Sequence, residues 1–392
     1  MNIYEFIQQR SSWEDFLILE EAKPFPDIKT MRRVMKIIQK KQYLKFNKEY
    51  LLSFALPQKV LLSEFNTSKK RTVYVYPEPY RTILKLTAMY MLNNYNDDFC
   101  GNSLAYTKGR SVKSGFRILR RWGLTRGDLV YKNDFSDYFN SINLDLLELE
   151  LTSFIEDEDK DLTIFIMKLL REQRVRYKKA IITVENKGVM AGSPIAGILA
   201  NIFMHKIDEQ MMKHDYKYIR YADDTLINGR DALAFFKKQV ALAGITLNPK
   251  KMKVMTLEDG ITFLGFKFVN TTVDISDKAL AKMKSRFKRR AKWYSKWART
   301  NNVKRDVAVR DYIKKINYKL FSDQDDSINW SRWYIPNINT PDSLHYLDIY
   351  FQTCIRYLYS GTWHRGKKHY ALTYKKMREL GYRSLVNEYY KY

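Results

Sequence analysis

The chain has 392 residues, and its 45% hydrophobic content is typical of a globular protein with a sizeable core, which excludes a disordered chain. Lysine and arginine number 69 against 43 aspartates and glutamates, so the net charge of +26 predicts a polyanionic partner, above all a nucleic acid. Two cysteines cannot build a disulfide framework or an ordinary zinc finger. Neither a signal peptide nor a run of roughly 18 apolar residues is visible, so we expect a soluble, cytoplasmic protein with no membrane partner.

Three regions with different patterns follow one another along the chain. Residues 1–60 are predicted to form an N-terminal helical extension, because apolar residues recur at helical spacing around Met31, Val34 and Ile37. Residues 61–272 alternate short β-rich segments with longer helical ones, which predicts an α+β unit. Its predicted strands are 72–76, 129–134, 216–222, 225–228 and 262–269. Residues 273–392 are predicted to form a basic helical region, because 281–305 hold eleven lysines or arginines and no acid.

One helix in the middle region has clear start signals. Ser193 and Pro194 are predicted to be its N-cap and its first residue. Its buried face should carry five apolar residues at helical spacing, which are Leu199, Ile202, Phe203, Ile207 and Met211. We expect this helix to pack under a sheet.

The sequence Tyr221-Ala222-Asp223-Asp224 stands between two predicted strands. Adjacent carboxylates at a hairpin tip repel each other, and a divalent cation between them and a phosphate would explain such an arrangement. Taken alone, however, an Asp-Asp pair is more often a solvated turn. A further strand, 129–134, ends in Asp134. Two strands that end in acids can converge on two metal ions, Mg²⁺ or Mn²⁺, which activate an attacking hydroxyl and neutralise a leaving pyrophosphate. Asp134 and Asp223 are the expected bridging ligands, with Asp224 and the backbone carbonyl of Phe135 as secondary ligands.

These segments resemble, in order, the conserved motifs of the reverse transcriptase family over roughly residues 69–270. The matching segments are 69–73, 80–81 and 99–111 of the fingers, 134–139 of motif A, 191–194 of motif B, 221–224 of motif C, 244–251 of motif D and 263–266 of the primer grip. The chain departs from the family before motif B. There it has Gly188-Val189-Met190 where the family usually has Gln-Gly, which puts the nucleotide contacts of that glutamine in doubt.

The resemblance implies a right-hand polymerase with fingers, palm and helical thumb, which adds dNTPs to a growing DNA strand. Phe139 would exclude a ribose 2′-OH, the alternative being an ordinary core aromatic, and Lys251 would protonate the pyrophosphate. Lys69 belongs to the matching fingers segment. Nucleotide contacts are expected from Lys70, Arg71, Arg81, Phe139, Ser193 and Pro194. Primer contacts are expected from Phe263, Leu264 and Gly265.

The basic helical region suits a thumb that follows the phosphates of a nucleic acid, while its aromatic residues pack or stack. Nucleic-acid contacts are expected from Arg286, Lys288, Arg289, Arg290, Lys292, Trp293 and Trp297. For the tryptophans the alternative is a place in the core, and for the cations a solvated basic face.

The C-terminal stretch 374–386 resembles the bacterial defence-associated reverse transcriptases of the unknown group. That resemblance implies that the chain copies part of a structured non-coding RNA, as template or also as primer, into cDNA during phage infection. No RNase H, integrase or zinc-bearing HNH domain is expected, and the Val-Thr-Gly triplet of retron thumbs is missing. The alternatives are a retron or group II intron-like enzyme, an RNA-dependent RNA polymerase, or a non-catalytic RNA-binding protein. The priming group, which could be a tyrosine hydroxyl, and the oligomeric state stay open.

Overall fold

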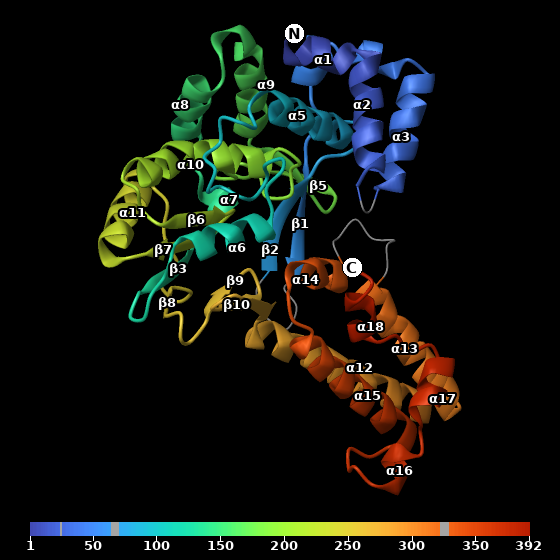
Figure 1. The fold of residues 1–392 in the computed structure, drawn as a ribbon. Coiled ribbons are helices and arrows are strands. Elements are labelled where there is room, and N and C mark those ends of the chain that lie inside the picture. The colour runs from blue at the N-terminus through green and yellow to red at the C-terminus, as the bar shows by residue number, and fades with distance from the viewer. Residues whose placement is uncertain (24–25, 64–69, 322–328) are drawn as a thin grey trace. The chain divides into compact units, whose positions relative to one another are not determined.

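The computed structural model describes residues 1–23, 26–63, 70–321 and 329–392 (Figure 1). Its contacts divide the chain into two compact units, Met1–Val254 and Met255–Tyr392. The α+β fold class is confirmed, because each unit combines helices with a largely antiparallel sheet. None of the helices in those residues is long and apolar enough to cross a membrane. Lys69 lies outside the described residues, and the division at residues 60 and 272 stays a prediction.

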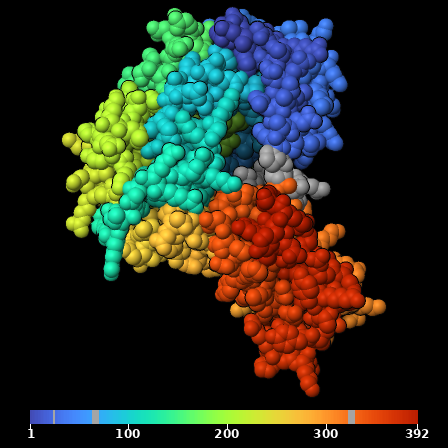
Figure 2. Space-filling view, in the orientation of Figure 1, coloured from blue at the N-terminus to red at the C-terminus, as the bar shows by residue number. Residues whose placement is uncertain are grey.

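The first unit begins with short helices: α1 Ile3–Gln8, α2 Arg10–Glu21, α3 Ile28–Gln39, η1 Gln42–Lys45 and α4 Lys48–Leu52. The side chains of Asn2, Asp27 and Asn47 accept hydrogen bonds from the first-turn N–H groups and so begin α1, α3 and α4. Fully buried Trp13 donates to the Ile7 carbonyl at 2.7 Å. On the face seen in Figure 2, these dark-blue helices lie directly beside the cyan segment of the same unit. Their apolar faces belong to the main core of that unit.

Two four-stranded sheets form the framework of the first unit. The first sheet has the order β2-β1-β4-β5, with β1 Gln58–Ser63, β2 Lys70–Val75, β4 Arg174–Tyr177 and β5 Ala180–Thr183. The second has the order β6-β7-β3-β8, with β3 Val130–Asp134, β6 Tyr218–Tyr221, β7 Asp224–Asn228 and β8 Lys253–Met255. The other helices of this unit are α5 Tyr80–Asn94, α6 Val112–Arg121, α7 Tyr138–Ser141, α8 Leu144–Phe154, η2 Asp157–Asp159, α9 Lys160–Arg171, α10 Ala196–Lys213 and α11 Arg230–Leu242.

Helices α10 and α11 cover one face of the second sheet (Figure 1). The ring of Tyr218 on β6 lies 5.5 Å from that of Phe236 on α11, and its hydroxyl donates to Asp208 on α10 at 2.8 Å. The five apolar residues predicted for the inner face of α10 are all buried, which confirms the helical spacing. The helix therefore packs against the sheet as expected.

The predicted start of α10 is wrong by two residues. The helix begins at Ala196, and Ser193 does not cap it. Instead, the Ser193 N–H donates to the Met190 carbonyl at 3.0 Å, and the Ala196 N–H donates to the Ser193 carbonyl at 3.1 Å. These short-range bonds make a tight turn ahead of the helix, and they leave the Ser193 hydroxyl buried without a partner.

The second unit contains a three-stranded sheet of order β11-β10-β9, with β9 Ile261–Phe263, β10 Phe266–Val269 and β11 Thr272–Ile275. The single strand predicted over 262–269 is wrong, because Leu264 and Gly265 have φ of 53° and 88° and form a tight turn. The helices that follow are α12 Asp277–Thr300, α13 Arg305–Phe321, α14 Trp330–Tyr334, η3 Ile335–Asn337, α15 Asp342–Ser360, α16 Lys367–Tyr370, α17 Tyr374–Glu379 and α18 Leu385–Tyr389. Phe287 and Phe351, with rings 4.8 Å apart, join α12 to α15.

Candidate active site

Three carboxylates meet at one end of the second sheet. Strands β3 and β7 pair antiparallel in a register that sets Asp134 directly opposite Asp224. Strands β6 and β7 form a hairpin in which Tyr221 pairs with Asp224, so Ala222 and Asp223 are its two-residue turn. Ala222 has φ of 56°, as the first turn residue of a tight hairpin requires. The pairing therefore brings together the three acids that the sequence predicted as metal ligands.

The three carboxylates differ in their electrostatic surroundings. The Lys251 ammonium lies 2.5 Å from Asp134 Oδ1, and the Lys132 ammonium lies 2.8 Å from Asp224 Oδ1. Partial burial, together with the charges of Asp224 and Asp134, raises the pKa of Asp223 above its usual value. Two carboxylates are therefore neutralised by lysines, while the third is destabilised by its like-charged neighbours.

The donor set fits divalent cations. Within the described residues, no three His, Cys, Asp or Glu side chains are already grouped in the geometry of a metal site. Carboxylate oxygens are nevertheless the ligands that Mg²⁺ prefers. In this structure the ammonium groups of two lysines lie beside Asp134 and Asp224, where they supply the positive charge that metal ions would otherwise supply. Asp134, Asp223 and Asp224 could hold metal ions once those lysines move.

A segment after α11 fixes the end of strand β3. The Asn248 N–H donates to the Asp134 carbonyl at 2.8 Å, and the Ser136 N–H donates to the Thr246 carbonyl at 2.9 Å. Phe135 forms an antiparallel bridge with Leu247, and its side chain is buried. These contacts bring the turn that carries Lys251 next to Asp134.

Phe139 lies on the short helix α7, and Tyr106 stands between it and Asp223 in the chain of interactions. The half-buried ring of Phe139 is 6.2 Å from that of Tyr106, and partial burial and the charge of Asp223 raise the pKa of Tyr106. The Phe139 carbonyl accepts from the Val189 N–H at 2.8 Å. A Cβ on Gly188, whose φ is 49°, would lie 2.1 Å from that carbonyl oxygen. The segment where the sequence departs from the family pattern therefore supports the backbone of Phe139.

Strand β2 lies against the turn that precedes α10. The Tyr74 N–H donates to the Ala191 carbonyl at 2.7 Å, and a Cβ on Gly192 would lie 3.1 Å from Val73 Cβ. The strand of Lys70 and Arg71 is thereby joined to the turn of Ser193 and Pro194. Arg81 is exposed in the first turn of α5 and takes no part in these two contacts.

The remaining predicted site residues belong to the second unit. Phe263, Leu264 and Gly265 form the β9–β10 hairpin, where Trp333 Nε1 donates to the Leu264 carbonyl at 3.3 Å. The φ of 88° at Gly265 favours glycine, and a Cβ there would also lie 2.6 Å from the Tyr334 hydroxyl, which would have to shift.

All seven residues predicted to bind nucleic acid lie on helix α12. The Trp293 side chain is 52% exposed and stacks on Trp297, with ring centroids 6.3 Å apart and an interplanar angle of 5°. The Lys288 ammonium lies 5.7 Å from the ring centroid of Trp363. Burial, followed by the charge of Arg289, lowers the pKa of Arg286. The other two residues, Arg290 and Lys292, are exposed.

Sequence reasoning missed the buried polar network beneath the hairpin turn. The fully buried Arg220 guanidinium donates to Asp208 through Nε and Nη2, at 2.9 and 2.5 Å. It also donates to Asn201 Oδ1 at 2.9 Å, to Ser103 Oγ at 2.8 Å and to the Ala222 carbonyl at 3.3 Å. The sequence gives one sign of this network, which is an arginine inside an otherwise apolar strand. A buried arginine requires buried partners.

Comparison with known proteins supports a polymerase-related family. A family model described as reverse transcriptase (RNA-dependent DNA polymerase) matches residues 57–268, which is more than half of the chain. No curated protein matches the chain.

Several solved structures share part of the fold. They include telomerase from Candida tropicalis with a fragment of telomeric RNA (15% identity, TM-score 0.45, 86% of this chain and 64% of that one) and telomerase from Candida albicans (12%, 0.41, 87% and 64%). A third is the RNA-dependent RNA polymerase of BmCPV (12%, 0.47, 73% and 30%). The chain thus spans less than two thirds of the length of each of these proteins, and the family assignment rests on the sequence match.

We predict that Arg220→Met lowers the free energy of unfolding by about 3 to 5 kcal/mol, because the buried Asp208 carboxylate would lose its cationic partner. Arg171→Met is the control, since Arg171 is half exposed and pairs with Asp145 and Glu148 at the surface. It should cost less than about 1 kcal/mol. Urea unfolding of both variants measures the difference, and equal losses would contradict a supporting role for the Arg220 network.

Proposed function

Because this chain belongs to the reverse transcriptase (RNA-dependent DNA polymerase) family, we propose that it extends a DNA strand along an RNA template by metal-dependent nucleotidyl transfer. The observation that carries this proposal is the strand register that brings Asp134, Asp223 and Asp224 to one end of the sheet. A non-catalytic RNA-binding protein would have no use for three carboxylates that repel one another at this point.

Asp134 and Asp223 would bridge two metal ions, with Asp224 and the Phe135 carbonyl as further ligands. Two Mg²⁺ or Mn²⁺ ions would supply the acidity that activates the primer hydroxyl and the charge that stabilises the leaving pyrophosphate. Lys251, released from Asp134, would then be free to donate a proton to the pyrophosphate. Lys70, Arg71 and Arg81 would hold the triphosphate, while Ser193 and Pro194 would let the backbone approach the nucleotide.

The choice of sugar separates DNA from RNA synthesis. Phe139 would occupy the volume of a ribose 2′-OH, which favours dNTPs over NTPs as substrates. The runner-up function is an RNA-dependent RNA polymerase, because such polymerases share the carboxylate arrangement and one of the similar structures is of that kind. The half-buried ring of Phe139 lies against Tyr106, whose pKa is raised by burial and by the charge of Asp223, and this placement favours the DNA polymerase.

For the biological context, we propose that the template is a structured non-coding RNA copied into cDNA in antiphage defence. The support is the resemblance of 374–386 to defence-associated members. In the structure, this stretch spans α17 and the start of α18, where Asp348 accepts from the Ser384 hydroxyl at 2.6 Å and from the Leu385 N–H at 2.9 Å. A retron or group II intron-like enzyme is the second choice.

The proposed activity predicts incorporation of labelled dNTP, but not NTP, on an RNA template with a DNA primer in Mg²⁺. EDTA should abolish it, and Asp224→Asn should reduce it by at least about 100-fold, because a metal ligand that stabilises the transition state is lost. Asp215→Asn is the control, because Asp215 is exposed and asparagine tolerates its φ of 52°. NTP incorporation would establish the runner-up, and no incorporation of either would contradict both.

A second prediction concerns sugar selection. Phe139→Ala should raise the rNTP to dNTP ratio of kcat/KM by about 10-fold, since roughly 1.4 kcal/mol corresponds to one decade. Gly188→Ala should also change this ratio, because its Cβ would push on the Phe139 carbonyl. Gly123→Ala is the matched control, since Gly123 has a similar φ of 56° with open space around it. If neither Phe139→Ala nor Gly188→Ala alters the ratio, Phe139 is a core residue.

A further inference from the structure

A strongly basic segment lies outside the catalytic machinery. Residues 28–48, from α3 into the start of α4, contain eight lysines or arginines and no acid. Most of these side chains are exposed, while Val34 and Ile37 of α3 point into the core. Arg33 pairs with Glu78 and Lys48 pairs with Asp161, but the other six cations still give the N-terminal helices an excess of positive charge. This excess favours a polyanion close to them.

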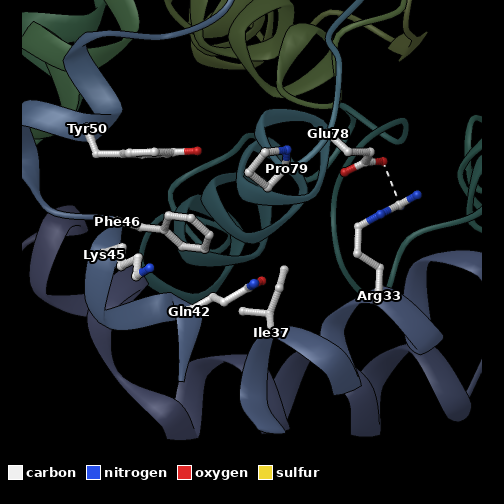
Figure 3. A pocket seen from close by; sticks show the side chains of 8 residues that line it. All are labelled: Arg33, Ile37, Gln42, Lys45, Phe46, Tyr50, Glu78 and Pro79. Carbon is white, nitrogen blue, oxygen red and sulfur yellow. Dashed lines mark hydrogen bonds and ion pairs between the residues drawn. The ribbon is translucent and has the colours of Figure 1, made fainter. Parts of the chain in front are cut away.

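A cavity of about 400 Å³ opens beside this segment (Figure 3). Ile37, Phe46 and Pro79 give it apolar walls, and the exposed side chains of Gln42 and Lys45 reach its rim. The volume suits a group about the size of a nucleobase with its sugar. Apolar walls that include the Phe46 ring, with a cation and an amide at the edge, match the chemistry of a base, which offers a π-face and a polar edge.

The walls of the cavity are held in place by contacts behind them. Tyr50, which also lines the cavity, stacks on Tyr80 with centroids 5.4 Å apart and an interplanar angle of 5°. Across the cavity, the Arg33 guanidinium pairs with Glu78 Oε1 at 2.7 Å (Figure 3). The other oxygen of Glu78 accepts from the Thr82 hydroxyl at 2.7 Å. The cavity is therefore preformed, and the one carboxylate on its wall is already neutralised.

We propose that this cavity receives an unpaired nucleobase of a single-stranded RNA whose phosphates follow the basic segment. The identity of the ligand as RNA rests on the proposed function. The location of the site rests on the cavity and the charge around it. The base inserts between the apolar walls, Gln42 contacts its polar edge, and Lys45 neutralises a neighbouring phosphate. The N-terminal helices thus bind the RNA at a point separate from the carboxylates.

The test is a binding assay with the full chain in EDTA, so that no synthesis occurs. The probes are a fluorescein-labelled twelve-nucleotide oligoadenylate and a ribose-phosphate chain of the same length without bases. Gln42→Trp fills the cavity with an indole. Gln39→Trp adds the same indole on an exposed position that does not line the cavity.

The wild type and Gln39→Trp should bind the oligoadenylate more tightly than the abasic chain. In Gln42→Trp this preference should fall by about 10-fold, within the range measured for one stacked base. The dependence of affinity on salt should not change, because no phosphate contact is removed. Equal preferences in the two tryptophan variants, or an equal loss of affinity for both probes in Gln42→Trp, would overturn the proposal.

A second measurement uses the unaltered protein and so does not depend on the folding of a variant. Cross-linking to oligouridylate that contains 4-thiouridine should label the tryptic peptides 42–45, 46–48 or 49–59, which carry Gln42, Phe46 and Tyr50. Labels confined to peptides that do not line the cavity would overturn the proposal. If the protein incorporates dNTP normally but does not prefer the oligoadenylate to the abasic chain, only the proposal of a base-binding cavity is refuted. If it shows that preference but incorporates no dNTP, only the proposed polymerase activity is refuted.

Discussion

The antiparallel pairing of β3 with β7 is the constraint on which the candidate site depends. Its register sets Asp134 against Asp224, and the β6–β7 turn adds Asp223 at the same end. Because a shift by one residue would turn every side chain of a strand to the opposite face, the hydrophobic pattern that fixes the register also fixes the carboxylates. The pairing is costly without a cation, since the acids repel one another.

The surroundings of the sheet offset this cost. Arg220 donates a hydrogen bond to the carbonyl of Ala222, the turn residue with positive φ, while its other donors join β6 to α10 through Asp208. On the opposite strand, the Asn248 N–H holds the carbonyl of Asp134. Hydrogen bonds from Arg220 and Asn248 thus hold the backbone of the hairpin turn and of Asp134, and so they fix the positions of the carboxylates. A preorganised site of this kind is what electrostatic stabilisation of a transition state requires.

Features that depend on local pattern were predictable from the sequence, and features that depend on distant partners were not. Strands 129–134 and 225–228 and the buried face of α10 follow from apolar spacing. The hairpin at Leu264 and Gly265 was missed because apolar residues continue on both sides of it. The side-chain partners of Arg220, and the approach of Gly188 to the Phe139 carbonyl, join segments 12 to about 120 residues apart. Such long-range contacts leave no periodic pattern in the sequence. The residues that support the site can therefore be identified only from the folded structure.

The fold forces three carboxylates together, and we infer that a divalent cation between them offsets their repulsion. Urea unfolding of the wild type and Asp223→Asn at neutral pH, in EDTA and in Mg²⁺, measures this effect. A carboxyl whose pKa is raised by folding costs stability above that pKa, so in EDTA the neutral asparagine variant should be the more stable. Mg²⁺ should stabilise the wild type more than the variant, because only the wild type keeps all its ligands. An asparagine variant that is less stable in EDTA, or equally stabilised by Mg²⁺, would contradict the claim.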